Sequence, residues 1–158
     1  MESNAELDSI DLAILAELQK DARLPNKDLA ERLGVAPSTA LERVRSLRRR
    51  GMITGFRATV DTARLGRPLQ ALFALRVKPH TRQIVDPLRA LVLSLPETIT
   101  LFHVAGTEDF LVHVAVADAD HLHRLALEKF LIRREIVHLQ TTLIFKTEHQ
   151  PIQLPAEM

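Results

Sequence analysis

The sequence predicts an α+β chain of two domains, a three-helix domain followed by a domain with the element order β-α-β-β-α-β. Apolar residues recur at helical spacing through the first 50 positions and alternate at every second position in several later segments. A stretch marked by glycine and proline, 65–68, lies between the two patterns. We therefore expect a first domain over 1–60, a linker over 61–68 and a second domain over 69–158.

Composition limits the classes of protein to consider. The chain has 158 residues, of which 46% are apolar, and no cysteine. Disulfides, cysteine zinc sites and cysteine nucleophiles are therefore excluded. The sequence has no apolar run of the roughly eighteen residues that a membrane span needs, and its acidic, polar start does not resemble a signal peptide. We expect a cytoplasmic protein without a membrane partner.

The first helix is predicted to begin at Asp8, which can cap it, with Asp11 near its positive end. It should continue to about Ala22, because Leu24-Pro25 breaks the pattern. The buried stripe of this helix is expected to contain Ile10, Ile14, Leu15 and Leu18.

The segment from Asn26 to Arg50 predicts two helices joined by a tight turn. Gly34 follows the first of them, where a left-handed backbone favours glycine, and Pro37 opens the second, where its missing N–H costs little. Gly51 should end the second helix, and Met52–Asp61 is expected to form a short strand or wing. The inward faces of the two helices are predicted to carry Leu29, Ala30, Leu33, Ala40, Val44 and Leu47.

The outward face of the second helix suits a major groove of double-stranded DNA. Between Ala36 and Arg57 the chain has six arginines and one acid. We expect Ser38, Thr39 and Arg43 to lie near base edges, because the start of a recognition helix meets the bases. The amides that begin at Asn26 and Lys27 suit a phosphate, and Arg57 is a further candidate. Phosphate contacts are assigned to Arg45, Arg48, Arg49 and Arg50.

The second domain has the order of a ferredoxin-like unit. Leu69 to Val77 alternates as a strand, and apolar spacing predicts a helix over 81–95. Two strands with a turn between them follow, and Asp118 can cap a second helix before the last strand. The three later strands are expected at 99–104, 110–117 and 137–147, with the turn at 105–109.

Together these features resemble the Lrp/AsnC (leucine-responsive, feast/famine) transcription regulators. The resemblance runs from about Leu7 to Thr147. It is carried by LDSIDLAILAELQKDAR, LAERLGVAPSTALERVRSLRRRGMITGF, the hinge VDTARLG, the turn VAGTEDF and the strand QTTLIF. It implies a winged helix-turn-helix that binds DNA and a ferredoxin-like effector and oligomerisation domain. The chain departs from the family pattern at Ala36, where a capping serine is common.

The resemblance also implies an amino-acid effector at the turn. Gly106 lets the backbone approach a ligand and exposes amides to its carboxylate, while Glu108 or Asp109 pairs with its ammonium. The alternative is a simple hairpin turn that Asp109 caps. The resemblance adds that a subunit contact completes the pocket. The expected effector-binding residues are Val104, Gly106, Thr107, Glu108, Asp109, Phe110, Gln140, Thr141 and Thr142.

The expected assembly is a homodimer built through the second-domain sheets, and the resemblance adds octamers of four dimers. We expect no metal and no cofactor, because the seven histidines show no recognisable ligand spacing. The competing function is that of a tetrapyrrole decarboxylase-like enzyme on the same fold without DNA binding. The one-sided arginines argue against it, and no residues are assigned to catalysis.

Overall fold

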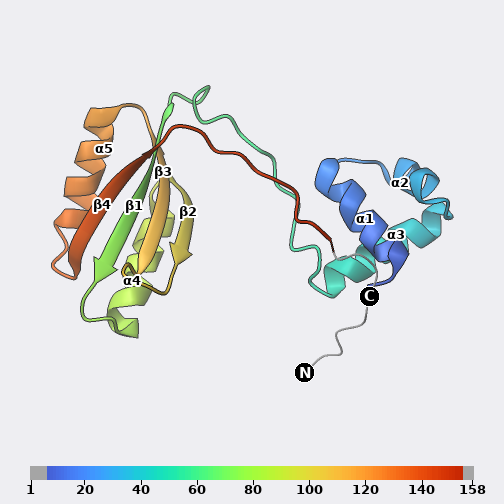
Figure 1. Cartoon of the computed structure of the whole chain (residues 1–158), viewed down its shortest axis with the longest axis horizontal. Coiled ribbons are helices and arrows are strands. Elements are labelled where there is room, and N and C mark those ends of the chain that lie inside the picture. The colour runs from blue at the N-terminus through green and yellow to red at the C-terminus, as the bar shows by residue number, and fades with distance from the viewer. Residues whose placement is uncertain (1–6, 155–158) are drawn as a thin grey trace. The chain divides into compact units, whose positions relative to one another are not determined.

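The computed structural model describes residues 7–154, which form two compact units (Figure 1). The first comprises the chain up to residue 59 together with the segment from 148, and the second comprises 60–147. The sequence predicted a first domain over 1–60 and a linker over 61–68. It predicted a second domain over 69–158, and in the structure the described segment 148–154 groups with the first unit.

The first unit contains α1 (Ser9–Lys20), α2 (Asn26–Leu33) and α3 (Pro37–Arg49). Asp8 caps α1, because its Oδ1 accepts the Asp11 N–H at 2.8 Å. The helix ends two residues earlier than the sequence predicted. Its small core joins one fully buried residue from each helix, which are Ile14, Leu29 and Leu47.

The predicted strand over Met52–Asp61 is absent, since this segment contains no strand. Backbone N–H groups of Met52 and Ile53 instead donate to Leu47 O at 2.9 and 3.2 Å, which closes the end of α3. A strand needs a neighbour for its ladder, and no strand of the described chain pairs with this segment.

The C-terminal segment docks on α1. The Gln19 amide makes two hydrogen bonds to the backbone of Ile152, accepting its N–H at 2.7 Å and donating to its carbonyl at 3.2 Å. Leu15, Leu18, Ile152 and Leu154 help to line an apolar groove of about 410 Å³ there. The Gln19 side-chain amide thus makes the two hydrogen bonds to Ile152 that the backbone of a neighbouring strand makes in a β-sheet.

The second unit is a four-stranded antiparallel sheet in the order β2-β3-β1-β4. The order of its elements along the chain confirms the predicted ferredoxin-like fold. A π-helical continuation, which the spacing did not predict, extends α5. The elements are β1 (Leu69–Val77), α4 (Arg82–Ser94), β2 (Thr98–His103), β3 (Phe110–Val116), α5 (Ala119–Leu125), η1 (Ala126–Leu131) and β4 (Ile136–Ile144).

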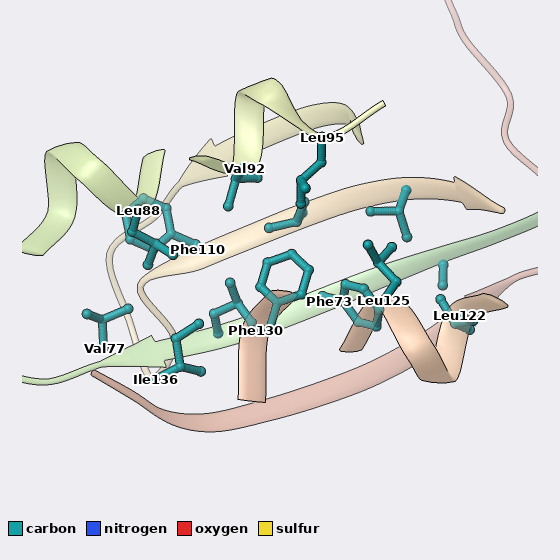
Figure 2. Close-up of a cluster of buried hydrophobic side chains, with 14 of the residues drawn as sticks. Phe73, Val77, Leu88, Val92, Leu95, Phe110, Leu122, Leu125, Phe130 and Ile136 are labelled. Carbon is teal, nitrogen blue, oxygen red and sulfur yellow. The ribbon is translucent and has the colours of Figure 1, made fainter. Parts of the chain in front are cut away.

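The helix α4 and the continuous segment α5–η1 cover the same face of the sheet (Figure 2). Every second residue of β1 from Ala71 to Val77 is buried against them. The Phe130 ring of η1 lies 5.2 Å from the Phe73 ring of β1, at a tilt of 59°. This single layer of side chains forms the core of the second unit.

No helix of the described chain packs on the other face of the sheet, which carries the alternate residues of β1. Leu72 lies beside His113 on β3, and Ala74 lies beside Leu111. Phe102 on the edge strand β2 pairs with Leu111 and is half exposed. The open face is thus partly apolar.

Phe130 provides a test of the core. Phe130→Ala should lower the free energy of unfolding by about 3–5 kcal/mol, because it removes a fully buried ring and leaves a cavity. The neighbouring Leu131→Ala is the control, since Leu131 is 48% exposed and should cost far less. Urea unfolding followed by circular dichroism measures both, and equal losses would contradict the assigned burial.

Candidate DNA-binding and effector sites

The turn between α2 and α3 has the geometry that the sequence predicted. Gly34 adopts the left-handed conformation with φ of 66°, and Pro37 occupies the first turn of α3. Ala36 provides no side-chain cap, in line with its departure from the family pattern. The Asn26 amide donates to Pro37 O at 2.8 Å and so ties the two helix starts together. Asn26 therefore has a structural partner besides its predicted phosphate.

The predicted DNA-contacting residues divide by exposure. Those with exposed side chains are Lys27, Ser38, Thr39, Arg45, Arg48 and Arg49. Arg49 donates to Glu42 at 2.7 Å, but both side chains of this pair are at least 60% exposed. These groups lie at the start of α2 and along α3, where they are available to a duplex.

Arg43 and Arg50 are less exposed and face α1. Arg43 pairs with Asp8, and its Nη1 also lies 3.2 Å from Asp11 Oδ1. Arg50 Nη1 lies 3.0 Å from Asp11 Oδ2. The sequence placed both arginines on DNA and did not predict these ion pairs, which join residues more than 30 positions apart.

The turn between β2 and β3 is fixed by Asp109. Its Oδ2 accepts the backbone N–H of Val77 at 2.7 Å, and its Oδ1 lies 3.1 Å from His80 Nδ1. Its backbone N–H donates to Leu75 O, and its carbonyl accepts from Val104. These contacts agree with the alternative in which Asp109 serves the turn itself.

Arg76 holds the two residues that precede Asp109 in the turn, a role that sequence analysis missed. Its Nε donates to Thr107 O at 2.7 Å, and its Nη2 donates to Glu108 Oε1 at 3.1 Å. The other carboxylate oxygen of Glu108 is buried and has no hydrogen-bond partner in the described chain. The only sequence signal for Arg76 was its outward position in an alternating strand.

Backbone donors without partners and a nearby irregularity of the sheet mark this turn as a candidate binding site. Within residues 7–154, the backbone N–H groups of Gly106, Thr107 and Glu108 make no hydrogen bond. The register of β1 against β4 shifts beside Arg76, a local irregularity of the kind often found near binding sites. The turn therefore combines backbone donors that lack a partner, which suit an anion, with a buried carboxylate oxygen of Glu108 that also lacks a partner.

Phe110 differs in its surroundings from the polar residues of the turn. It is 1% exposed and its ring stacks on His103 at 4.6 Å, while His103 stacks on His80 at 5.4 Å. This column of rings runs from the buried Phe110 to the exposed His103 and His80. Phe110 therefore has almost no surface for a ligand.

The three predicted residues of β4 do not point the same way. Gln140 and Thr142 pair with Ala74 and Leu72 and so lie on the open face with Arg76. Thr141 lies on the helical side, where it lines a groove beside α5. Alternation along the strand separates Thr141 from the other two.

Other histidines have ordinary partners. His113 contacts Gln70 at 2.9 Å, and His121 contacts Glu97 at 3.1 Å. Within the described residues, no three histidine or acidic side chains are grouped to hold a metal ion, and no helix is long and apolar enough to span a membrane.

Comparison with protein families identifies both units. A winged helix-turn-helix DNA-binding model matches residues 7–54, and the Lrp/AsnC ligand binding domain matches 70–152, more than half of the chain. The chain belongs to the Lrp/AsnC family of transcription regulators. Its Lrp/AsnC domain contains the turn described above, and its helix-turn-helix contains α3.

Relatives of the Lrp/AsnC family cover nearly the whole chain. The regulator AldR of Mycolicibacterium smegmatis is 37% identical over 89% of this chain and 82% of its own length. The leucine-responsive regulatory protein of Rhizobium meliloti is 31% identical over 89% and 90%. These relatives are regulators, so the chain is a regulator and not a decarboxylase-like enzyme.

Solved structures agree. A transcriptional regulator of Neisseria meningitidis in complex with L-methionine is 25% identical, with a TM-score of 0.85 over 95% of this chain and 97% of its own. A feast or famine regulatory protein of M. tuberculosis complexed with L-methionine is 30% identical, with a TM-score of 0.80 over 94% and 99%. This chain therefore shares its fold with both regulators over nearly the whole of each compared chain.

The Asp8 cap gives a pH-dependent contribution to stability. The Asp11 N–H, and then Arg43, hold the pKa of Asp8 below its usual 3.8. A lowered folded-state pKa means that the unfolded chain binds more protons, so this stabilisation is present above pH 3.8 and is lost as the pH falls through the folded-state value. Asp8→Asn should therefore lower the free energy of unfolding at pH 7, by less than about 1 kcal/mol because Asp8 is half exposed.

Urea unfolding of both proteins at pH 7 and near pH 3 measures this difference. It should shrink at the lower pH. A difference that grows as the pH falls would contradict the assigned role of Asp8.

Proposed function

We propose that the regulator binds an α-amino acid at the turn between β2 and β3, and that this binding modulates its assembly or its hold on DNA. The observation that carries the proposal is that one turn contains both backbone N–H groups without partners, at 106–108, and a buried oxygen without a partner, Glu108 Oε2, which the ligand would have to uncover. An α-amino acid has one carboxylate and one ammonium, which match these two groups. The L-methionine complexes of two related structures support the same class of ligand.

Glu108 is the better candidate for the ammonium than Asp109. Both Asp109 oxygens already serve the fold, through Val77 and His80. Glu108 has one oxygen held by Arg76 and one without a partner. Arg76 fixes the carboxylate in place, so it serves as the positioning residue of the proposed site. Val104 donates its N–H to Asp109 O, and the buried Phe110 follows the turn directly.

We further propose a homodimer that packs the open faces of two sheets together. The partly apolar face is otherwise left to water, and pairing buries it. Gln140 and Thr142 lie on that face, so a partner subunit can bring them to the pocket. Octamers of four dimers remain the extension that the family resemblance implies. We place the protein in the cytoplasm with its double-stranded DNA.

On DNA, α3 is proposed to enter the major groove with Ser38 and Thr39 toward the base edges. The exposed arginines 45, 48 and 49 meet phosphates, and Lys27 adds a phosphate contact at the start of α2. A two-fold dimer presents two such helices, so its site has half-sites about one helical turn, or a multiple of it, apart.

A thermal-shift screen of the twenty amino acids tests the effector. At least one amino acid should raise the melting temperature, since a ligand at 100 times its Kd adds about 2.7 kcal/mol of stability. Glu108→Gln should abolish that shift, because it removes the proposed partner of the ammonium. Glu128→Gln removes an exposed acid of η1 and should keep it.

Two results would contradict this proposal. The absence of any shift would argue against an amino-acid effector. An equal shift in Glu108→Gln would place the ligand elsewhere. Asp109→Ala is a poor probe, because loss of its contacts to Val77 and His80 should lower the melting temperature without any ligand.

Salt dependence tests the phosphate contacts. Arg48→Ala should weaken binding to a mixed-sequence duplex and reduce the slope of log affinity against log salt by about 1, since one fewer counterion is released. Arg64→Ala removes an exposed arginine outside α3 and serves as control. Fluorescence anisotropy from low to moderate salt gives the slopes, and an unchanged slope in Arg48→Ala would remove it from the interface.

A further inference from the structure

Asp11 is the one charged side chain among the described residues that is buried. It is 3% exposed and lies on α1, near the fully buried Ile14. Each carboxylate oxygen has its own arginine, with Arg43 on Oδ1 at 3.2 Å and Arg50 on Oδ2 at 3.0 Å. A buried carboxylate is costly unless it is paired in this way. We call this group of three residues the α1–α3 clasp.

The two arginines are seven positions apart, which is about two turns of α3. Leu47 lies between them in the sequence and is fully buried in the core of the same unit. Apolar contact at Leu47 is not directional and permits α3 to rotate or slide. Two ion pairs to one carboxylate, one on either side of Leu47, restrict both motions.

The clasp adjoins the residues proposed to read DNA. A cleft of about 530 Å³ is lined by Asp11, Arg43 and Arg50 and also by the hydroxyl residues Ser38, Thr39 and Ser46. The rotation of α3 that the clasp sets therefore also sets where the hydroxyls at its start point. Base reading needs such precision, because each hydrogen bond to a base edge tolerates only a short range of distance and angle.

We propose that Asp11 is a positioning residue for DNA recognition, and that Arg43 and Arg50 orient α3 through it instead of contacting DNA. The sequence-based expectation placed both arginines on the duplex. The inference rests on the proposed reading of DNA by α3. It divides the five arginines from 43 to 50 into three that face solvent and two that face Asp11.

The alternative is that Arg43 leaves Asp11 and reaches a base when DNA binds. In that case Asp11 competes with DNA for the guanidinium, and removing its charge favours the complex. Under the clasp, removing the charge loosens α3, although Arg43 keeps its pair with Asp8, and disfavours the specific complex. Asp11→Asn therefore gives effects of opposite sign under the two arrangements.

The experiment uses the full-length protein and two probes, a duplex that the wild type selects from a random pool and a mixed-sequence duplex. The variants are Asp11→Asn, Arg43→Ala, the double variant and Arg48→Ala as matched control. Anisotropy gives both affinities and their salt slopes, well below the melting temperature of each variant.

We expect Asp11→Asn and Arg43→Ala each to lower the ratio of specific to mixed-sequence affinity by about tenfold. The double variant should have a ratio no lower than that of the more impaired single variant, because both changes break the same contact. Their salt slopes on mixed-sequence DNA should match the wild type, because no phosphate contact is lost. Arg48→Ala should instead reduce the slope and keep the ratio.

The inference is overturned if Asp11→Asn keeps or raises specific affinity while Arg43→Ala lowers it, or if Arg43→Ala reduces the salt slope. If the wild type binds no duplex at all, the proposed function itself is contradicted. This result differs from a failure of the clasp alone, in which the wild type still binds DNA. If the Asp11→Asn protein does not fold, the ratio of specific to mixed-sequence affinity of Arg43→Lys distinguishes the two arrangements. Lysine keeps a cation beside Asp11 and should preserve the ratio, whereas a two-point base contact needs the guanidinium.

Discussion

The two-residue period of β1 sets the organisation of the second unit, because this strand pairs on both sides and contributes to both faces of the sheet. One set of side chains, from Ala71 to Val77, lies under the helices and supplies the core. The alternate set makes the open face and ends in Arg76, which holds the turn. A slip of one residue in register would exchange the two sets, so the core and the proposed effector site depend on the same pairing.

Local signals made much of the fold predictable. Asp8, Gly34 and Pro37 act on neighbouring backbone, so their roles as cap, stop and start follow from sequence alone. The sequence suggested a short strand or wing over Met52–Asp61, and this segment contains no strand. A strand depends on a partner, and the sequence of the segment itself does not say whether one is present.

The sequence predicted where the candidate sites lie, but not which of several chemically similar residues makes which contact. Glu108 and Asp109 are adjacent acids, yet one holds the backbone and the other keeps an oxygen without a partner. The arginines of α3 are equivalent in the sequence and divide only through contact with α1. Such differences arise from pairs more than 30 residues apart, which periodicity and composition do not reveal.

The docking of Ile152 on Gln19 makes the first unit discontinuous along the chain, with the whole second unit inserted into it. During synthesis, α1 to α3 leave the ribosome early, but the segment that completes their surface follows only after β4. Domains generally fold as units in the order of synthesis. The DNA-binding unit therefore begins to fold first and is completed last, and Ile152 reaches α1 only once every strand of the effector unit has been made.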